Sequence, residues 1–401
     1  MSQLDPIQPA QRIEPIDVLR GLALFGVLLI NLVMEFRVSI FEQFLPGHGA
    51  KDPLDHALQT FLTLAVELKA FALFSLLFGI GLAIQFDRLA ANAQRTRLLI
   101  RRLFVLLAIG IVHLFLIWDG DILTHYAFAG FIVLPLLFGP SWLLPAAGLC
   151  FLSLYFVLPQ ASPLPAVPPV QWILQHVDEA RRVYASGGFL EILQFRIREV
   201  PAIVPLHMFI FPRTLAMFCF GAALWRSGLL MLSAPSTTLL RTGAVGLIPA
   251  GAMLTLAAAQ PDWLGIKSAG SSQFAIESLG SVTLAFGYGA AILAAANQQT
   301  GRRLLAWAAP VGRMAFTCYL TQSVLMGFIF YGYGLGLFGR MGVAPALLLA
   351  IAIYAVQVAI SQWWLRVFYY GPVEWLWRRV MYGLPQPMRR RSDASARPQV
   401  A

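Results

Sequence analysis

Charged residues are scarce in this chain of 401 residues. Asp, Glu, Lys and Arg together make up 12% of it, whereas hydrophobic residues make up 58% and the mean hydropathy is +0.71. One water-soluble core cannot hide so much apolar surface, so a single soluble globular domain is excluded. The composition predicts an all-α, polytopic membrane helical bundle.

Cysteine is scarce too, and a cleavable signal peptide is lacking. Cys150, Cys219 and Cys318 stand singly in apolar surroundings, which favours neither a CxxC metal site nor a disulfide framework. The apolar run after Arg20 continues at spanning length without a small-residue cleavage site. We therefore expect no metal and no redox centre, and we expect the first span to remain in the mature protein.

What the sequence does have is apolar runs near the length that crosses a bilayer. They are residues 17–35, 69–87, 103–118, 122–138, 141–158, 205–225, 241–259, 274–296, 313–335 and 343–365. Ten spans put both termini on one side, and arginines crowd the connections on that side, which predicts that both termini are cytoplasmic. These arginines are Arg88, Arg95, Arg97, Arg101, Arg102, Arg302, Arg303, Arg366, Arg378, Arg379, Arg389, Arg390 and Arg391.

The spans predict one membrane domain over residues 1–388 and a basic, disordered cytoplasmic tail over 389–401. The connection 159–204 is expected outside, with an amphipathic stretch near 171–198 on the outer interface. We expect the protein in the bacterial plasma membrane. Membrane lipids are expected partners and nucleic acid is not, while the oligomeric state, including a homodimer, stays open.

The segment Arg101–Tyr126 is the most informative part of the chain. It places His113 inside an apolar run and ends that run at Trp118-Asp119-Gly120-Asp121, where the next run begins. An intramembrane imidazole needs a partner or a function. Asp119, Asp121 and Tyr126 are its candidate partners.

Other readings of these polar residues stay open. Asp121 can be a helix N-cap, Asp119-Gly120 can be a turn, and Asn31 can join helices through an amide hydrogen bond. Arg213, inside the sixth span, can bind an anion or pair with Glu277 or Glu67.

Several blocks of the sequence resemble a known family. They are RIEPIDVLRGLALFGVLLINL, FALFSLLFGIGLAIQFDR, HLFLIWDGDIL, VGRMAFTCYLTQS, FYGYGLGLFG and GPVEWLWRR, and they look like the YeiB-like bacterial membrane proteins, a domain of unknown function. The opening Asp17-x-x-Arg20-Gly21, with Asn31 eleven residues after Arg20, is also similar to the first span of transmembrane acyltransferases. Those include heparan-alpha-glucosaminide N-acetyltransferase and bacterial glycan O-acetyltransferases.

The acyltransferase resemblance implies transfer of an acyl group, such as acetyl, from cytoplasmic acyl-CoA to a hydroxyl or amine acceptor at the outer face. Arg20 and Asn31 match the pattern. The O-acetyltransferases, however, carry histidine where this chain has Asn31, and the heparan enzyme has its catalytic histidine where this chain has Glu42. His113 is therefore the expected base, oriented by Asp119 or Asp121, with Asn31 or Tyr126 donating to the oxyanion.

The donor would bind through its phosphates, because guanidinium groups match phosphate oxygens in bidentate geometry. The expected arginines are Arg20, Arg88, Arg95, Arg97, Arg101, Arg102 and Arg313. The acceptor is expected to be a glycan or small molecule. Two alternatives stay open: a proton-coupled transporter of a small solute, and a noncatalytic scaffold or lipid-binding protein.

Overall fold

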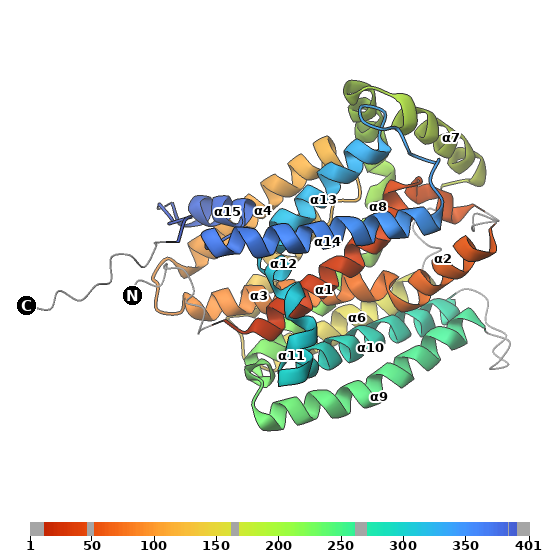
Figure 1. Ribbon diagram of the computed structural model, residues 1–401. Coiled ribbons are helices and arrows are strands. Elements are labelled where there is room, and N and C mark those ends of the chain that lie inside the picture. Colours follow the sequence, from red (N-terminus) through yellow and green to blue (C-terminus); the bar gives the residue numbers. More distant parts are fainter. Residues whose placement is uncertain (1–11, 46–51, 162–167, 261–270, 384, 391–401) are drawn as a thin grey trace, which may run out of the picture.

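The computed structural model describes residues 12–45, 52–161, 168–260, 271–383 and 385–390, and helices dominate them. The α-helices are α1 (Glu14–Ile30), α2 (Pro53–Ala65), α3 (Glu67–Arg88), α4 (Arg95–Val112), α5 (Leu123–Leu136), α6 (Leu143–Ala161), α7 (Val170–Ser186), α8 (Phe189–Arg226), α9 (Ala234–Ala259), α10 (Ser271–Ala296), α11 (Gln299–Leu305), α12 (Ala309–Arg313), α13 (Ala315–Phe330), α14 (Val343–Val367) and α15 (Pro372–Tyr382). Figure 1 shows them as one bundle of roughly aligned rods. The all-α prediction is confirmed.

The apolar helices coincide with the predicted spans. Seven helices of the described chain are long and apolar enough to cross a membrane, and three shorter apolar helices lie at Leu123–Leu136, Leu143–Leu158 and Ala315–Phe330. These ten helices match the ten apolar runs of the sequence. The protein is thus a polytopic membrane protein, and ten complete crossings remain a prediction.

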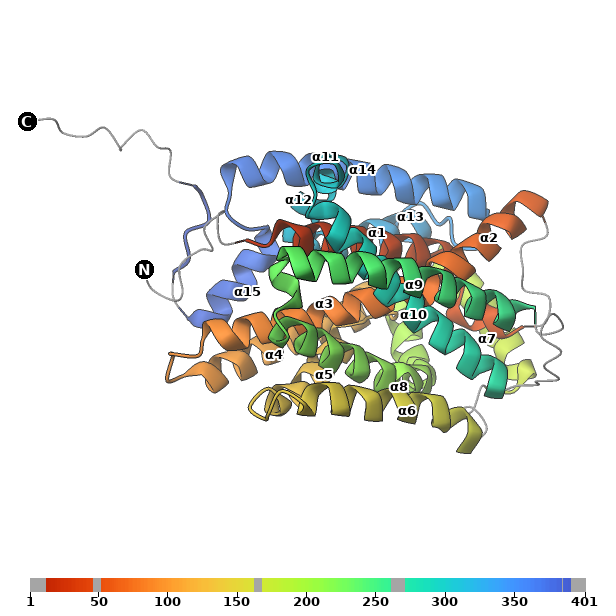
Figure 2. The same cartoon turned by 90° about the horizontal axis from the view of Figure 1, so that it is seen from below.

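The bundle has two distinct ends (Figures 1 and 2). Helix α15 and the turn between α3 and α4 lie at one end, which we call the arginine end, and α7 lies at the other, the α7 end. Helix α1 runs through the middle, where Val18, Leu19 and Leu24 are fully buried. Arg12, at the start of the described chain, and Arg378, on α15, both lie at the arginine end because they line one cavity there.

Glycines allow helices α3 and α8 to cross closely. A Cβ added to Gly79 of α3 would lie 2.1 Å from the carbonyl oxygen of Phe218, and one added to Gly221 of α8 would lie 2.1 Å from that of Leu76. No side chain fits at such distances, so these two glycines allow α3 and α8 to touch through their backbones. This crossing fixes α8 beside the cavity that α3 lines.

Helix α8 differs from the prediction. The sequence places residues up to 204 in an outer connection, whereas the structure has one continuous helix of 38 residues from Phe189, with Pro201, Pro205 and Pro212 inside it. Charged residues near the start of this helix contact other elements of the bundle. Arg196 and Glu199 are buried there against partners from other elements.

The tail that the sequence predicts to be disordered, residues 389–401, begins with two residues that the structure describes. Arg389 forms an isolated antiparallel bridge with Phe368, and the backbone N–H of Arg390 donates to the carbonyl of Val367 at 2.9 Å. Residues 391–401 lie outside the described residues. The chain after α15 therefore returns to pack beside the end of α14.

Candidate functional site

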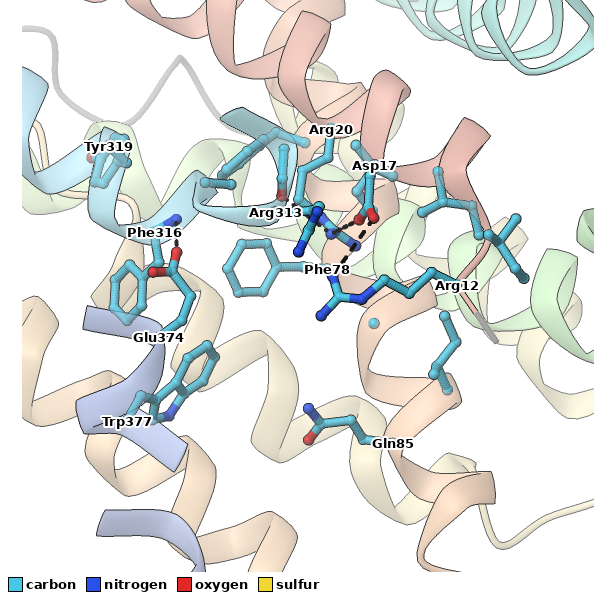
Figure 3. A pocket seen from close by; sticks show the side chains of 18 of the residues that line it. Arg12, Asp17, Arg20, Phe78, Gln85, Arg313, Phe316, Tyr319, Glu374 and Trp377 are labelled. Atoms are coloured by element: carbon cyan, nitrogen blue, oxygen red, sulfur yellow. Dashed lines mark hydrogen bonds and ion pairs between the residues drawn. The ribbon is translucent and has the colours of Figure 1, made fainter. Parts of the chain in front are cut away.

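A cavity with a volume of about 510 Å³ opens between α1, α3, α13 and α15 at the arginine end (Figure 3). Six arginines line it: Arg12, Arg20, Arg88, Arg102, Arg313 and Arg378. Its two carboxylates are Asp17 and Glu374. Because the described lining carries six cations against two anions, the cavity attracts anionic ligands.

Arg12, Arg20 and Arg313 converge around Asp17 (Figure 3). Arg20 donates to Asp17 at 3.0 Å, and the Arg12 guanidinium lies 3.9 Å from the other Asp17 oxygen. Burial lowers the pKa of Arg12, and Asp17 opposes that effect. One carboxylate cannot saturate three guanidiniums, so N–H donors remain for a ligand that carries several anionic oxygens.

Glu374 is held by the start of α13 and leaves little capacity for a ligand. One of its oxygens accepts from the backbone N–H groups of Phe316 at 2.8 Å and Thr317 at 3.0 Å, and the other accepts from the Thr317 hydroxyl at 2.5 Å. Burial raises the pKa of Glu374, and these hydrogen bonds oppose that effect. The carboxylate thus fastens α15 across the cavity as a helix cap.

A second contact fastens α15 from its other side. The Trp377 indole N–H donates to the carbonyl of Arg102 at 3.1 Å, and the Arg102 guanidinium lies 4.7 Å from the Trp377 ring centre. Helix α15 therefore forms one wall of the cavity and positions Arg102 in it.

The cavity becomes apolar with distance from its arginines. Phe74, Leu77 and Phe78 of α3 line it with Leu123 and Phe316, and Figure 3 shows Phe316 and Tyr319 on the side away from Arg12. The Tyr319 ring centre is 5.3 Å from that of His113. His113 does not itself line the cavity, so Tyr319 stands between the imidazole and the space.

His113 is fully buried and lies against Asp121. Its Nδ1 is 2.8 Å from Asp121 Oδ1, a close contact without hydrogen-bond geometry, and its Nε2 has no hydrogen-bond partner in the described part of the chain. Asp121 also caps α5, because its oxygens accept from the backbone N–H groups of Leu123 at 3.1 Å and Thr124 at 2.7 Å. Asp121 therefore both contacts His113 and caps α5.

Both His113 and Asn31 begin π-helical segments. Helix α4 continues as the π-helix His113–Ile117, and α1 continues as Asn31–Phe36. Short π-helical insertions often accompany functional sites because they redirect side chains. Asn31 is buried and its Oδ1 has no partner among the described residues, but it does not line the cavity.

Other predicted residues lie elsewhere. The Tyr126 hydroxyl is hydrogen-bonded to Ser75 at 2.9 Å, and Asp119 lies 4.0 Å from Arg196, away from His113. Glu42, at the position of the heparan enzyme's histidine, pairs with Arg181 at 2.7 Å near α7. Asn31 and Tyr126, the predicted hydrogen-bond donors to the oxyanion, therefore do not line the cavity, and neither does His113.

The predicted arginines divide into two sets. Arg20, Arg88, Arg102 and Arg313 line the cavity, whereas Arg95, Arg97 and Arg101 do not. Arg95 instead lies over the Phe86 ring, 3.1 Å from its centre, and Arg97 and Arg101 are exposed. Arg95, Arg97 and Arg101 all lie on α4, and they point to different sides because they stand at different positions around the helix.

The sequence prediction missed Arg12, Tyr319, Glu374, Trp377 and Arg378 as site residues. A signal was present, since all lining residues except Arg102 and Trp225 fall within the sequence blocks that carry the family resemblance. Blocks far apart in the chain that build one cavity indicate a shared site.

A separate polar cluster lies near α7 and consists of Asp119, His176, Tyr184, Arg196 and Glu199. Glu199 accepts from the Tyr184 hydroxyl at 2.5 Å and lies 2.7 Å from His176 Nε2. Arg196 donates to the carbonyl of Phe115 at 3.0 Å. The cluster ties α7, α8 and the connection after α4 together.

Within the described residues no group of three or more His, Cys, Asp or Glu side chains could hold a metal ion. The fold and the cavity define a polytopic helical membrane protein with an arginine-lined pocket at one end.

The comparisons with known proteins identify its family. A family model described as "Protein of unknown function (DUF418)" matches residues 224–384. The chain is 35% identical to the uncharacterized protein YxaH of Bacillus subtilis, over 98% of this chain and 100% of YxaH. It is 31% identical to the uncharacterized protein YeiB of Escherichia coli, over 92% of this chain and 96% of YeiB. The chain belongs to this YeiB-like DUF418 family.

Proposed function

We propose that the protein transfers an acyl group from cytoplasmic acyl-CoA to an acceptor that enters from the opposite side of the membrane. The observation that carries the proposal is the cavity, which has arginines at its mouth and an apolar wall that ends at Tyr319, against His113. This order of chemistry matches a ligand with a polyanionic head and an apolar reactive end.

The donor fits the cavity in one direction. Its phosphates lie at the arginine end, where Arg12, Arg20 and Arg313 offer charge-assisted hydrogen bonds. Its pantetheine arm follows the wall formed by Leu77 and Phe78. The thioester then reaches Tyr319.

His113 acts as the general base. Asp121 lies at its Nδ1, which leaves Nε2 to take the proton of the acceptor hydroxyl or amine. The acceptor oxygen or nitrogen forms a bond to the thioester carbonyl carbon, the carbon–sulfur bond breaks, and the departing thiolate receives the proton from the imidazolium. The products are free CoA and the acylated acceptor, and His113 returns to its neutral form.

Tyr319 controls the meeting of donor and base. Because its ring separates His113 from the cavity, it must turn aside before the thioester and the imidazole share an acceptor. A closed Tyr319 keeps water and His113 from the thioester until then.

Binding of acetyl-CoA to the purified full chain in nanodiscs tests the proposal. Arg313→Ala should weaken binding on the order of tenfold or more, because a hydrogen bond to a charged group contributes about 1.5–3 kcal/mol. Arg97→Ala is the matched control, since Arg97 is exposed outside the cavity. Wild-type protein without measurable affinity for acetyl-CoA would rule out the proposal and favour solute transport.

A further inference from the structure

Arg213 is a buried cation without a direct partner. It lies in the middle of the membrane-spanning part of α8 with 4% of its surface exposed. Among the described residues it donates no hydrogen bond and forms no ion pair within 4.0 Å, and its Nη1 is wholly inaccessible and unpaired. A guanidinium carries five N–H donors, and leaving them unpaired in a membrane interior is costly.

The nearby carboxylates do not pair with the N–H donors of Arg213. Glu67 and Glu277 are close enough for their charges to act on the surrounding cations, Lys69 among them, but neither contacts Arg213. Lys69 donates to the carbonyl of Thr63 at 3.1 Å. The guanidinium lies over the Tyr155 ring, whose centre is 5.7 Å away.

Two histidines connect Arg213 with the His113–Asp121 pair. The rings of His125 and His207 are 5.8 Å apart, the charge of Arg213 acts on His125, and the charge of Asp121 acts on His207. His125 Nε2 is also buried without a hydrogen-bond partner in the described chain. Asp121 and Arg213 therefore each lie within electrostatic range of one member of a pair of neighbouring histidines, and we call this group of residues the polar path.

Helix α5 separates this path from the acyl-CoA cavity. Tyr126 packs on Phe74 and Phe78, which line the cavity, whereas His125, its neighbour in the chain, packs on Phe211 of α8. Asp121 lies just before both. A ligand at Arg213 would thus approach the His113–Asp121 pair from the side opposite to the donor.

The outer surface of α8 lies close by. Val204 and Met208, on the same helix as His207, are 46% and 63% exposed on an apolar face. In a membrane this face meets lipid. A membrane-borne ligand can therefore reach the polar path past one layer of side chains.

We propose that Arg213, flanked by His125 and His207, binds the phosphate group of the acceptor and places the acceptor beside the His113–Asp121 pair. The inference rests on the proposed function for the role of the bound molecule, but the anion site itself does not. A guanidinium matches phosphate in bidentate geometry, and the neighbouring imidazoles add donors.

Thermal unfolding of the full chain in a neutral maltoside detergent tests the site. Phosphatidylglycerol represents a lipid-borne phosphate, glycerol 3-phosphate a soluble one, and phosphatidylcholine serves as the neutral lipid control. One of the first two should raise the unfolding temperature of wild-type protein in a saturable manner. Wild-type protein that responds to neither would overturn the proposal.

Three variants locate the response. Arg213→Met should abolish it, Arg213→Lys should weaken the affinity on the order of tenfold because the fork geometry is lost, and Arg182→Met should keep it, since Arg182 is exposed on α7. Without ligand, Arg213→Met should be at least as stable as wild type, because it removes a buried charge that no group neutralises directly.

Two outcomes contradict the site directly. An Arg213→Met protein that responds like wild type shows that the anion binds elsewhere, and one that fails to fold shows that protein groups hold the guanidinium. Acetyl-CoA affinity should be unchanged in Arg213→Met. Wild-type protein that binds the phosphate probe but no acetyl-CoA would refute the acyl-transfer proposal and leave the anion site standing.

Discussion

His113 Nδ1 lies 2.8 Å from an oxygen of Asp121, and that same carboxylate caps the first turn of α5. A shift of α5 must therefore move the partner of the imidazole. Because Asp121 contacts both the start of α5 and the imidazole of His113, different substitutions at Asp121 can separate its effect on stability from its effect on the proposed activity.

The first prediction compares three changes at this pair. Asp121→Asn keeps an oxygen that can cap α5 but loses the charge that stabilises an imidazolium, so stability should change little while turnover falls about 100-fold or more. Asp121→Ala should lose turnover and also about 1 kcal/mol of stability. His113→Ala should abolish turnover and leave acetyl-CoA affinity unchanged. Turnover, unfolding temperature and acetyl-CoA affinity are the measurements, and an active His113→Ala enzyme would remove His113 from the mechanism.

The second prediction concerns Tyr319 as the barrier between the cavity and His113. Tyr319→Leu should shorten the barrier and let water reach the thioester, so release of free CoA thiol without acceptor should rise several-fold, on the order of 1 kcal/mol in activation free energy. Tyr319→Phe keeps the ring and is the control. Equal thiol release from wild type and Tyr319→Leu would show that the ring does not protect the donor.

The third prediction concerns pH and Asp119. Burial and then the charge of Glu199 raise the pKa of Asp119 from 3.8 to about 7, and Arg196 opposes them. Between these values the folded protein binds more protons than the unfolded chain, so the stability from this group is full below pH 3.8 and is lost as pH rises through about 7. Asp119→Asn should flatten this part of the curve of unfolding temperature against pH. A curve parallel to that of wild type would contradict the shift.

The fourth prediction concerns topology. Gly188→Cys is a suitable outer probe because a Cβ there meets nothing within 4 Å, whereas one at Gly120 would lie 2.2 Å from the Trp118 ring. With the exposed Cys150 replaced by Ala, an impermeant maleimide should label Gly188→Cys on intact cells and Arg97→Cys only after the cells are opened. The buried Cys219 and Cys318 should stay unlabelled. Labelling of both probes from one side would refute the arrangement.

The spans and the burial of His113 could be predicted from the sequence because both depend on local properties. Apolar runs of spanning length and a lone imidazole within one of them are visible in a short window. Which of Asp119 and Asp121 contacts His113 cannot be predicted from a short window, since it depends on how α4 and α5 cross. Asp119 is drawn to Arg196, which lies far along the chain on α8.

The cavity could be predicted only in part for the same reason. Arg20 belongs to a recognisable pattern, but the approach of Arg12 and Arg378 to one space requires the packing of α15 against α4 and α13. The early start of α8 was hidden because Arg196 and Glu199 make its first turns polar, and their buried partners come from other segments.

The length of α8 has a mechanical consequence. At 1.5 Å per residue its 38 residues extend about 57 Å, while the hydrocarbon core of a bilayer is about 30 Å thick. Even with a tilt, the helix emerges far beyond the lipid and carries His176 and Tyr184 of α7 on its buried contacts with Glu199. Helix α7 is therefore attached to a helix that packs between α3 and α6, so a displacement of α7 is transmitted along α8 toward Trp225 in the cavity wall.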